Sequence, residues 1–422
     1  MVRPRVFLLC LTALAACSDG VTSPLERSLF VDIRSAPGGD GSESAPFQNL
    51  GEAVNRANEQ GGATIRVAPG RYETAQTIRI QSTVAILGSN VMKYDANGWP
   101  TGEVAAGSET RIVGTTALGT TPLILVSGLD ARIVTDVTIA ALTLDIVPAD
   151  GYTVLLVKAQ DFHVRDNILL GASFVALNMS ASSGQIIGNY ITGTGCGICV
   201  GGGNTGSPAT VEVRGNRVLR ARFGGVLLSG SGIDVPEFAD QLDATIVAND
   251  LSDNVATNGT GFGIRVMIIR RDMGAPQDTQ STGHIRAVIT RNRLVNNQIG
   301  IILDGGFPYR RVGTVCDVRT YAGTIAVTLN GNTITGSTRT PALVTFTRST
   351  AALTQSTLSA WQYLHNTTFT VTDPDRSLAG YWLDHPTNDP FLGPCAADQN
   401  AELLTNRFLY NGVTIGNARN LP

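Results

Sequence analysis

The chain of 422 residues has little charge, almost no lysine and few aromatic residues. Charged residues make up 15% of the sequence and aromatic residues 6%, and lysine occurs only at Lys93 and Lys158. The formal net charge is -3, and no run of basic residues occurs. Because a nucleic-acid-binding surface needs clustered positive charge, these absences argue against nucleic acid as the main partner.

Apolar runs long enough to cross a membrane are also missing. A membrane-spanning helix needs about 20 apolar residues, and the apolar stretch at residues 6–16 is shorter than that. Arg3 and Arg5 precede it at the start of the chain. A short positive region followed by a short apolar stretch predicts a secretory signal peptide, here over residues 1–16.

The end of this stretch, Leu14-Ala15-Ala16-Cys17, resembles the lipobox of bacterial lipoproteins. The resemblance implies that Cys17 is lipidated. The mostly polar composition of residues 17–29, with Gly, Ser and Pro, predicts a tether. Acyl chains would then hold the protein to a membrane, on the periplasmic or extracellular face of the bacterial cell envelope. The alternative is an ordinary signal peptide with a chance cysteine.

A short motif recurs through the body of the chain: an apolar residue, two residues, asparagine, one residue and a second apolar residue. Its asparagines are Asn167, Asn189, Asn216, Asn249, Asn292 and Asn332. A second alternating run follows the motif, as at residues 197–200 and 263–266. Since one coil alone cannot bury its apolar face, such repeats predict stacked coils. We therefore expect an all-β fold, a single-stranded right-handed parallel β-helix over residues 30–350.

Asparagine suits the corner of such a coil for two reasons. It tolerates left-handed backbone, and its amide can bond to the asparagine one coil away. A β-sandwich with many asparagine turns is the alternative, but it explains the shared order of motif, turn and second strand poorly.

One segment ahead of the repeats has helical spacing, with Asn49 as a possible N-cap. Its apolar positions are Phe47, Leu50, Ala53, Val54 and Ala57. Residues 30–72, including Gly38-Gly39-Asp40-Gly41, Ala45-Pro46-Phe47 and Val67-Ala68-Pro69-Gly70-Arg71-Tyr72, look like the opening of bacterial pectate-lyase-like β-helix proteins. That opening includes an uncharacterised domain family. The resemblance implies that the helix caps the first coil, and it says little about activity because this fold carries lyases, hydrolases, epimerases and adhesins.

The coils lengthen along the chain. Successive motif asparagines are 22, 27, 33, 43 and 40 residues apart, and the excess falls after the second strand, near 201–209, 230–243, 268–284 and 305–323. Insertions at one corner of successive coils project from the same side, and function in repeat proteins tends to sit on such loops. Tolerated drift at a permissive corner is the alternative.

These insertions and the strand beside them supply the candidate site. Alternation turns Arg265 outward between Ile264 and Val266, and Asp304 should lie diagonally beside it one coil later. The candidate substrate-binding residues in the insertions are Arg270, Arg271, Tyr309, Arg310 and Arg311. Arginine forks bind carboxylates and aromatic rings stack on sugars, so this set predicts polysaccharide recognition. A solvated surface of salt bridges is the alternative for any one of them.

Catalysis has weaker support. Arg265 is a weak candidate for the base of a polysaccharide lyase, with Asp304 beside it and acids that could hold calcium, although no clear calcium motif occurs. The hydrolase motifs of this fold are missing, since no two Asp residues are adjacent anywhere in the chain. No His pair has metal-ligand spacing, so we expect no metal site and no cofactor.

Four cysteines remain after the predicted cleavage. A disulfide between Cys316 and Cys395 would pin the tail onto the coils, in an envelope that permits disulfides. Cys196 and Cys199 are expected either to form a local bridge or to be two buried thiols.

Residues 351–422 lose the motif, and they form either a cap or an aromatic carbohydrate-binding surface.

The sequence thus predicts a cell-envelope lipoprotein whose β-helix binds an extracellular polysaccharide, and it leaves open whether the protein also cleaves that polysaccharide. If it is an enzyme, it is a polysaccharide lyase or a glycoside hydrolase. The alternative is a non-catalytic structural or adhesive solenoid.

Overall fold

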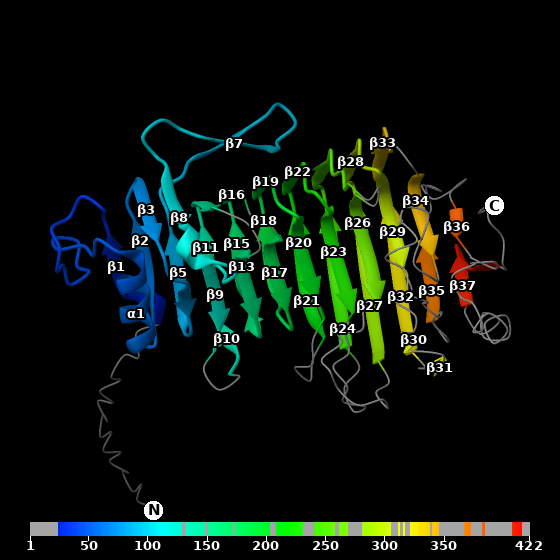
Figure 1. The fold of residues 1–422 in the computed structure, drawn as a ribbon, viewed down its shortest axis with the longest axis horizontal. Coiled ribbons are helices and arrows are strands. Elements are labelled where there is room, and N and C mark those ends of the chain that lie inside the picture. The colour runs from blue at the N-terminus through cyan, green and yellow to red at the C-terminus, as the bar shows by residue number, and fades with distance from the viewer. Residues whose placement is uncertain are drawn as a thin grey trace, which may run out of the picture.

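The protein is a right-handed parallel β-helix, seen in a computed structural model (Figure 1). Three long sheets, named A, B and C here, run along the solenoid, and each coil passes through A, B and C before it returns to A. The structure describes residues 24–128, 132–147, 151–171, 174–202, 208–230, 240–257, 261–268, 281–304, 311–312, 315–316, 321–337, 340–345, 367–372, 382–384 and 407–415.

The strands of each sheet are as follows. Sheet A contains β1 (Ser28–Val31), β2 (Gly62–Val67), β5 (Thr83–Leu87), β11 (Thr138–Ala140), β15 (Phe162–Arg165), β18 (Gly184–Ile187), β21 (Ala209–Arg214), β24 (Asp240–Val247), β27 (Ser281–Thr290), β32 (Tyr321–Asn330), β35 (Thr367–Thr372), β37 (Arg407–Tyr410) and β38 (Val413–Ile415). Sheet B contains β3 (Gly70–Thr74), β8 (Thr110–Gly114), β12 (Thr143–Ile146), β16 (Ile168–Leu170), β19 (Tyr190–Thr192), β22 (Arg217–Leu219), β25 (Asp250–Ser252), β28 (Arg293–Val295) and β33 (Thr333–Thr335). Sheet C contains β4 (Ile78–Ile80), β9 (Ile124–Ser127), β13 (Tyr152–Val157), β17 (Val175–Ser180), β20 (Cys196–Gly201), β23 (Gly224–Gly230), β26 (Phe262–Ile268), β29 (Ile299–Asp304), β34 (Thr340–Thr345) and β36 (Trp382–Asp384).

The remaining elements are short. They are η1 (Pro24–Glu26), α1 (Leu50–Glu59), η2 (Thr116–Leu118), and the strand pairs β6 (Met92–Tyr94) with β7 (Pro100–Val104), β10 (Val134–Thr135) with β14 (Ala159–Gln160), and β30 (Arg311–Val312) with β31 (Val315–Cys316). Among the described residues, no helix is both long and apolar enough to cross a membrane.

The core is a stack of apolar side chains that point inward from all three sheets. In one coil, Ile186 of sheet A, Ile191 of sheet B and Ile198 of sheet C are all fully buried, and they belong to one continuous cluster. The neighbouring coils present apolar residues at the same register positions. Because each coil closes the core of the next, the repeat predicted from sequence is confirmed as the basis of the fold.

The motif asparagines form a buried ladder at the corner between sheets A and B. The Asn189 backbone N–H donates to Asn216 Oδ1 at 3.0 Å, and Asn189 Nδ2 donates to the same oxygen at 2.9 Å. Along the ladder the backbone bonds measure 2.9 to 3.0 Å and the side-chain bonds 2.9 to 3.1 Å. The predicted amide contact between successive coils is therefore confirmed.

The predicted left-handed backbone lies one residue earlier than expected. None of the six motif asparagines has a positive φ. The residue before each one does, for example Gly215 (65°), Ala248 (52°) and Arg291 (55°). The preceding residue makes the sharp turn, and this leaves the asparagine side chain free to point into the corner, where it pairs with buried backbone groups.

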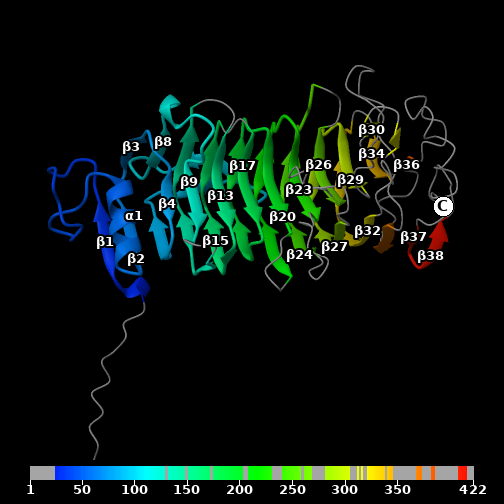
Figure 2. The same ribbon diagram turned by 60° about the horizontal axis from the view of Figure 1, so that its bottom comes forward.

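The helix predicted from apolar spacing is α1. The Asn49 side chain caps it by accepting a hydrogen bond from the Gly51 N–H at 2.7 Å, as the sequence indicated. Its buried face joins the main core through Leu50, Ala53, Val54 and Ala57, whereas Phe47 lies before the helix and pairs with Val31. Figure 2 shows α1 beside β1, β2 and β4 at the N-terminal end of the solenoid.

A hairpin, β6 and β7, leaves the coils between β5 and β8 and lies over sheet B (Figure 1). Asp95 in its turn forms an ion pair with Arg217 of β22 at 3.0 Å, and Tyr94 Oη donates to Asp166 at 3.3 Å. Arg217 also contacts the fully buried carboxylate of Asp250 at 3.1 Å, and Arg293 contacts that carboxylate at 2.7 Å. The hairpin is thus held to coils far from its own.

Parallel pairing continues beyond residue 350, where the sequence motif ends. β35 pairs with β32 and then with β37 in sheet A, and β36 pairs with β34 in sheet C. Among the described residues, sheet A ends in an antiparallel pair of β37 with β38.

The asparagine ladder predicts a large stability cost for one substitution. Asn249→Ala removes the acceptor of the Asn216 backbone and side-chain N–H groups and the donor to the Val213 carbonyl. Since unsatisfied buried polar groups are costly, we expect the free energy of unfolding to fall by about 3 kcal/mol. Urea denaturation of wild type and variant measures this difference in the free energy of unfolding. Asn97→Ala, in the exposed hairpin turn, is the control and should change stability by less than about 0.5 kcal/mol.

The hairpin predicts a pH effect at Asp95. Desolvation raises the pKa of Asp95, but hydrogen bonds from the Trp99 and Asn97 amides and the charge of Arg217 outweigh it and lower that pKa. The ionised carboxylate therefore stabilises docking above its ordinary pKa of about 3.9, and this contribution is lost as the pH falls further. In hydrogen exchange corrected for intrinsic rates, the hairpin amides should lose protection below about pH 4 before the coils do. Asp95→Asn should exchange equally above and below that pH, and acid loosening in this variant would contradict the prediction.

Candidate functional site

The outer face of sheet C carries the central residue predicted from sequence. Arg265 is in register between Leu227 of β23 and Ile302 of β29, and its neighbours Ile264 and Val266 are fully buried in the core. Its side chain is only partly exposed. Asp304 is in register with Met267, so its backbone lies diagonally from Arg265 one coil later. The side chain of Asp304 lies outside the described residues.

The four insertions share one corner. They connect β20 to β21, β23 to β24, β26 to β27 and β29 to β32, so each one leads from sheet C to sheet A. Part of each predicted loop is strand, because β24 already begins at Asp240 and β27 at Ser281. His284 therefore lies in sheet A, where its Nδ1 is 2.7 Å from Thr324 Oγ1, and not beside Arg265.

Most of the other predicted site residues belong to parts of the chain that the structure does not describe. Arg270, Arg271, Tyr309, Arg310, Cys17 and Cys395 lie outside the described residues. Arg311 and Cys316 belong to the antiparallel pair β30 and β31, but their side chains are not among those described. The roles predicted for these residues, and the disulfide, stay predictions.

A row of aromatic side chains, which the sequence analysis missed, follows the corner between sheets B and C. The row consists of Tyr152, Phe174 and Phe223, whose rings contact one another in this order, and of the buried Phe262, whose ring lies over Gly224, the residue after Phe223. The rings of Tyr152 and Phe174 meet edge-on at 5.7 Å, and those of Phe174 and Phe223 at 6.5 Å. Phe174 is 49% exposed and Phe223 45% exposed, which is unusual for such large apolar groups.

The two exposed rings meet across an intervening coil. Gly195 lies between them, since the Cys196 N–H donates to the Phe174 carbonyl and the Phe223 N–H to the Gly195 carbonyl. With no side chain at Gly195, nothing separates the rings. The available signal was positional, because Phe174 opens one second alternating run and Phe223 comes two residues before another.

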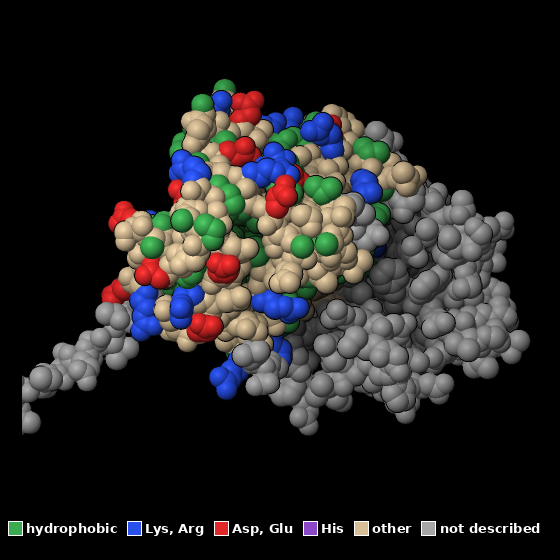
Figure 3. Space-filling view, turned by 60° about the vertical axis from the view of Figure 1, so that its left-hand side comes forward, with side chains coloured by type: hydrophobic (Ala, Val, Ile, Leu, Met, Phe, Trp, Pro, Cys, Tyr) green, Lys and Arg blue, Asp and Glu red, His purple; other side chains and the backbone are tan. Residues whose placement is uncertain are grey.

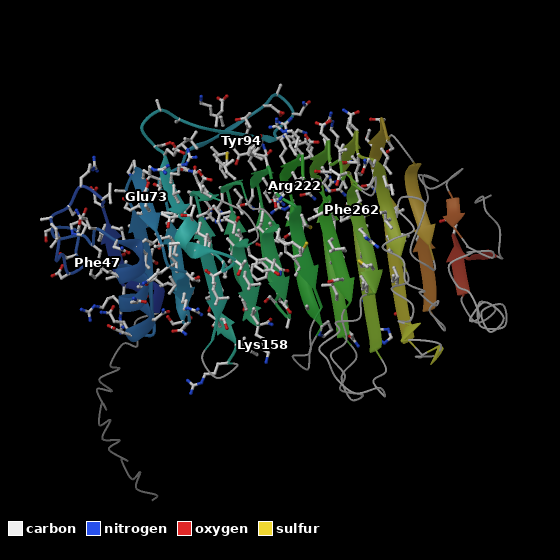
Figure 4. All side chains as sticks on the ribbon, in the orientation of Figure 1. Phe47, Glu73, Tyr94, Lys158, Arg222 and Phe262 are labelled. Atoms are coloured by element: carbon white, nitrogen blue, oxygen red, sulfur yellow. The ribbon has the colours of Figure 1, made fainter. Side chains whose placement is uncertain are left out.

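Two exposed arginines stand beside the row. Arg220 and Arg222 lie three residues and one residue before Phe223, and Arg220 has the positive φ of 57° that turns the chain at this corner. The Arg222 N–H donates to the Thr194 carbonyl one coil earlier. Figure 4 shows Arg222 and Phe262 along the same edge of the solenoid.

The two cysteines of sheet C are buried thiols, one of the two arrangements expected from sequence. Cys196 and Cys199 pack with Val175, Tyr152 and Leu227. Burial, together with its hydrogen bond to Cys196, raises the pKa of the Cys199 thiol well above its usual range. A thiol that stays protonated is a poor nucleophile, so the geometry gives no support to redox catalysis. Within the described part of the chain, no three His, Cys, Asp or Glu side chains are grouped so that they could hold a metal ion.

A family model described as "Protein of unknown function (DUF1565)" matches residues 36–303. The chain belongs to the DUF1565 family. The match covers α1, the hairpin and the coils through β29. No curated protein sequence matches this DUF1565 protein significantly.

Solved β-helix structures resemble the DUF1565 chain at low identity. A mutant DFA-IIIase from Arthrobacter chlorophenolicus A6 in complex with DFA-III is 15% identical, with a TM-score of 0.35 over 82% of this chain and 94% of that one. A rhamnogalacturonan lyase is 11% identical, with a TM-score of 0.34 over 92% and 95%. The catalytic unit of a GH87 alpha-1,3-glucanase from Streptomyces thermodiastaticus strain HF3-3 is 16% identical, with a TM-score of 0.34 over 82% and 68%.

Proposed function

We propose that the protein binds an extracellular polysaccharide along the outer face of sheet C and its corner with sheet B. The observation that carries the proposal is the aromatic row, in which Phe174 and Phe223 are each nearly half exposed. Large apolar groups are normally buried, and an exposed apolar patch with a polar rim commonly marks a binding surface.

The chemistry of a sugar fits this patch. One face of a pyranose ring presents C–H groups, and an aromatic ring can cover that face without needing a polar partner. The rings repeat along the solenoid, where successive strands lie about 4.8 Å apart. A polymer of similar units matches a surface that repeats in this way better than a single small molecule does.

The positive charge favours an acidic polymer. Arg220 and Arg222 are exposed beside Phe223, and Arg265 lies farther along sheet C. An arginine fork binds a carboxylate through paired hydrogen bonds, which lysine cannot do. Arg270, Arg271, Tyr309, Arg310 and Arg311 would extend the surface from the insertions, with Asp304 at the end of β29.

Cleavage is the finer part of the proposal. Arg265 is the candidate base for an elimination that would leave an unsaturated sugar, and Asp304 is its candidate partner. A structural or adhesive solenoid is the competing function, in which the row only packs against itself.

Two aromatic substitutions test the binding surface. Phe174→Ala with Phe223→Ala should weaken binding of an acidic polysaccharide, identified on a printed glycan array, by about tenfold or more, since central aromatic contacts dominate binding energy. Val91→Ala, which also shortens an exposed apolar side chain, is the control and should leave binding unchanged. Equal binding by wild type and the double variant would contradict the proposal, and so would the absence of any bound glycan.

Cleavage is measured separately on any bound polysaccharide. New ultraviolet absorbance from unsaturated products, abolished by Arg265→Ala, is the result expected of a lyase. Binding without new absorbance would remove the lyase and keep the binding protein.

We also propose that Cys17 carries the lipid that anchors the protein in the cell envelope. The support is the Leu14-Ala15-Ala16-Cys17 sequence behind a short apolar stretch. When the full chain is expressed in a bacterium fed radiolabelled palmitate, wild type should be labelled and Cys17→Ser should not. Cys10→Ser is the matched control and should keep the label. Label that persists on Cys17→Ser would refute the anchor.

A further inference from the structure

A cleft opens at the N-terminal end of the solenoid, between α1 and the first strands of sheets B and C. Its volume is about 780 Å³. On one side it is lined by the N-cap Asn49 and by Glu52 and Asn55 of α1, and on the other by Glu73, Gln76 and Arg79 on or beside β3 and β4. A smaller hollow of about 230 Å³ adjoins it and shares Asn49, Glu52 and Glu73. Figure 3 faces this end of the molecule and shows acidic and basic side chains interspersed with hydrophobic ones.

The cleft has mostly polar walls, and the smaller hollow beside it adds an apolar floor. Leu50, Tyr72, Ile78 and Ile112 line the smaller hollow, and all four are at least 96% buried. Side-chain amides and carboxylates stand around them. A pocket of this kind, apolar with a few polar groups that fix orientation, is typical of small-molecule sites, and its two chemistries match the C–H face and the hydroxyl groups of a sugar.

Its charge differs from that of the aromatic row. Two carboxylates, Glu52 and Glu73, face the cleft with one arginine, Arg79. Glu73 forms an ion pair with Arg71 at 3.1 Å, but both side chains are more than half exposed, so this pair is weak and easily exchanged. The α1 N-terminus offers an anion little, because the Asn49 side chain already accepts from the Gly51 N–H and Glu52 stands in the first turn.

The cleft lies on the same corner as the row. Its residues Gln76 and Thr77 connect β3 to β4, which is the corner between sheets B and C in the first coil. Thr121 occupies that corner in the next coil. It lies against Gly151, the residue before Tyr152: a Cβ added at Gly151 would be only 3.1 Å from the Thr121 carbonyl oxygen. Figure 4 shows Glu73, Arg222 and Phe262 following one edge of the solenoid.

We infer that this cleft is a separate sugar subsite, which takes an uncharged or cationic sugar unit and is closed on its far side by α1. The inference rests on the proposed function in one respect: a polysaccharide bound along the aromatic row would extend along the same corner to the cleft. A carboxylate-bearing sugar is disfavoured in the cleft by Glu52 and Glu73, whereas Arg220 and Arg222 favour it on the row.

Three tetrasaccharides test this assignment in saturation-transfer NMR titrations of the full chain. They are the tetramers of glucosamine, N-acetylglucosamine and galacturonic acid, which are cationic, neutral and anionic. The first two should bind wild type, and Glu52→Gln with Glu73→Gln should weaken the cationic tetramer about tenfold, the size of one lost charged hydrogen bond. Glu59→Gln, on the same helix and outside the cleft, is the matched control and should bind like wild type.

The failure of this inference can be told from failure of the proposed function. Phe174→Ala with Phe223→Ala should weaken polysaccharide binding and leave tetramer binding to the cleft unchanged. If the polysaccharide binds through the row but no cationic or neutral tetramer binds, or the Glu52 and Glu73 substitutions change nothing, the cleft assignment is wrong and the row stands. If the galacturonic acid tetramer binds best and the Glu52 and Glu73 substitutions reduce its binding, the cleft takes an acidic sugar, and the assignment to an uncharged or cationic sugar is wrong.

Discussion

The asparagine ladder is the interaction on which the coils depend. From Asn167 to Asn292, the asparagine at the turn from sheet A to sheet B lies outside the strands and its own backbone N–H is buried, so this N–H needs an acceptor. The asparagine of the next coil supplies it: the side-chain oxygen of that asparagine accepts from the backbone N–H and from the Nδ2 of the preceding one, while its own Nδ2 donates to the following asparagine and to a backbone carbonyl. The ladder is kept while the spacing between asparagines grows from 22 to 43 residues.

The sequence predicted this architecture because its signal is local and repeated. The apolar alternation, the recurring asparagine and the spacing of Leu50, Ala53, Val54 and Ala57 each lie within a few residues. The sequence prediction placed the left-handed backbone at the asparagine, one residue too late, for a physical reason. Gly215, Ala248 and Arg291 all adopt it, so the conformation is imposed by the stacked corner and leaves no consistent residue type to recognise.

The candidate site was only partly accessible to such reasoning. The outward position of Arg265 follows from alternation within one strand, and the shared corner of the insertions follows from the constant motif. The aromatic row depends on register between coils. Phe174 and Phe223 are brought together over Gly195, and no pattern within either segment contains that relation. The polar cleft likewise needs α1 to be placed against β3 and β4.

The hairpin also changes how the solenoid can fold. In an ideal repeat array each coil meets only its neighbours, so unfolding can begin anywhere and spread one coil at a time. The contact of Asp95 with Arg217 joins positions 122 residues apart and bypasses the coils between β8 and β22. Because its partner strand must exist first, this contact closes only after the coils up to β22 have stacked. Once closed, it ties the coil that carries the hairpin to the coil of β22, and fraying from the N-terminal end must release the hairpin before the coils from β8 to β22 can separate one at a time.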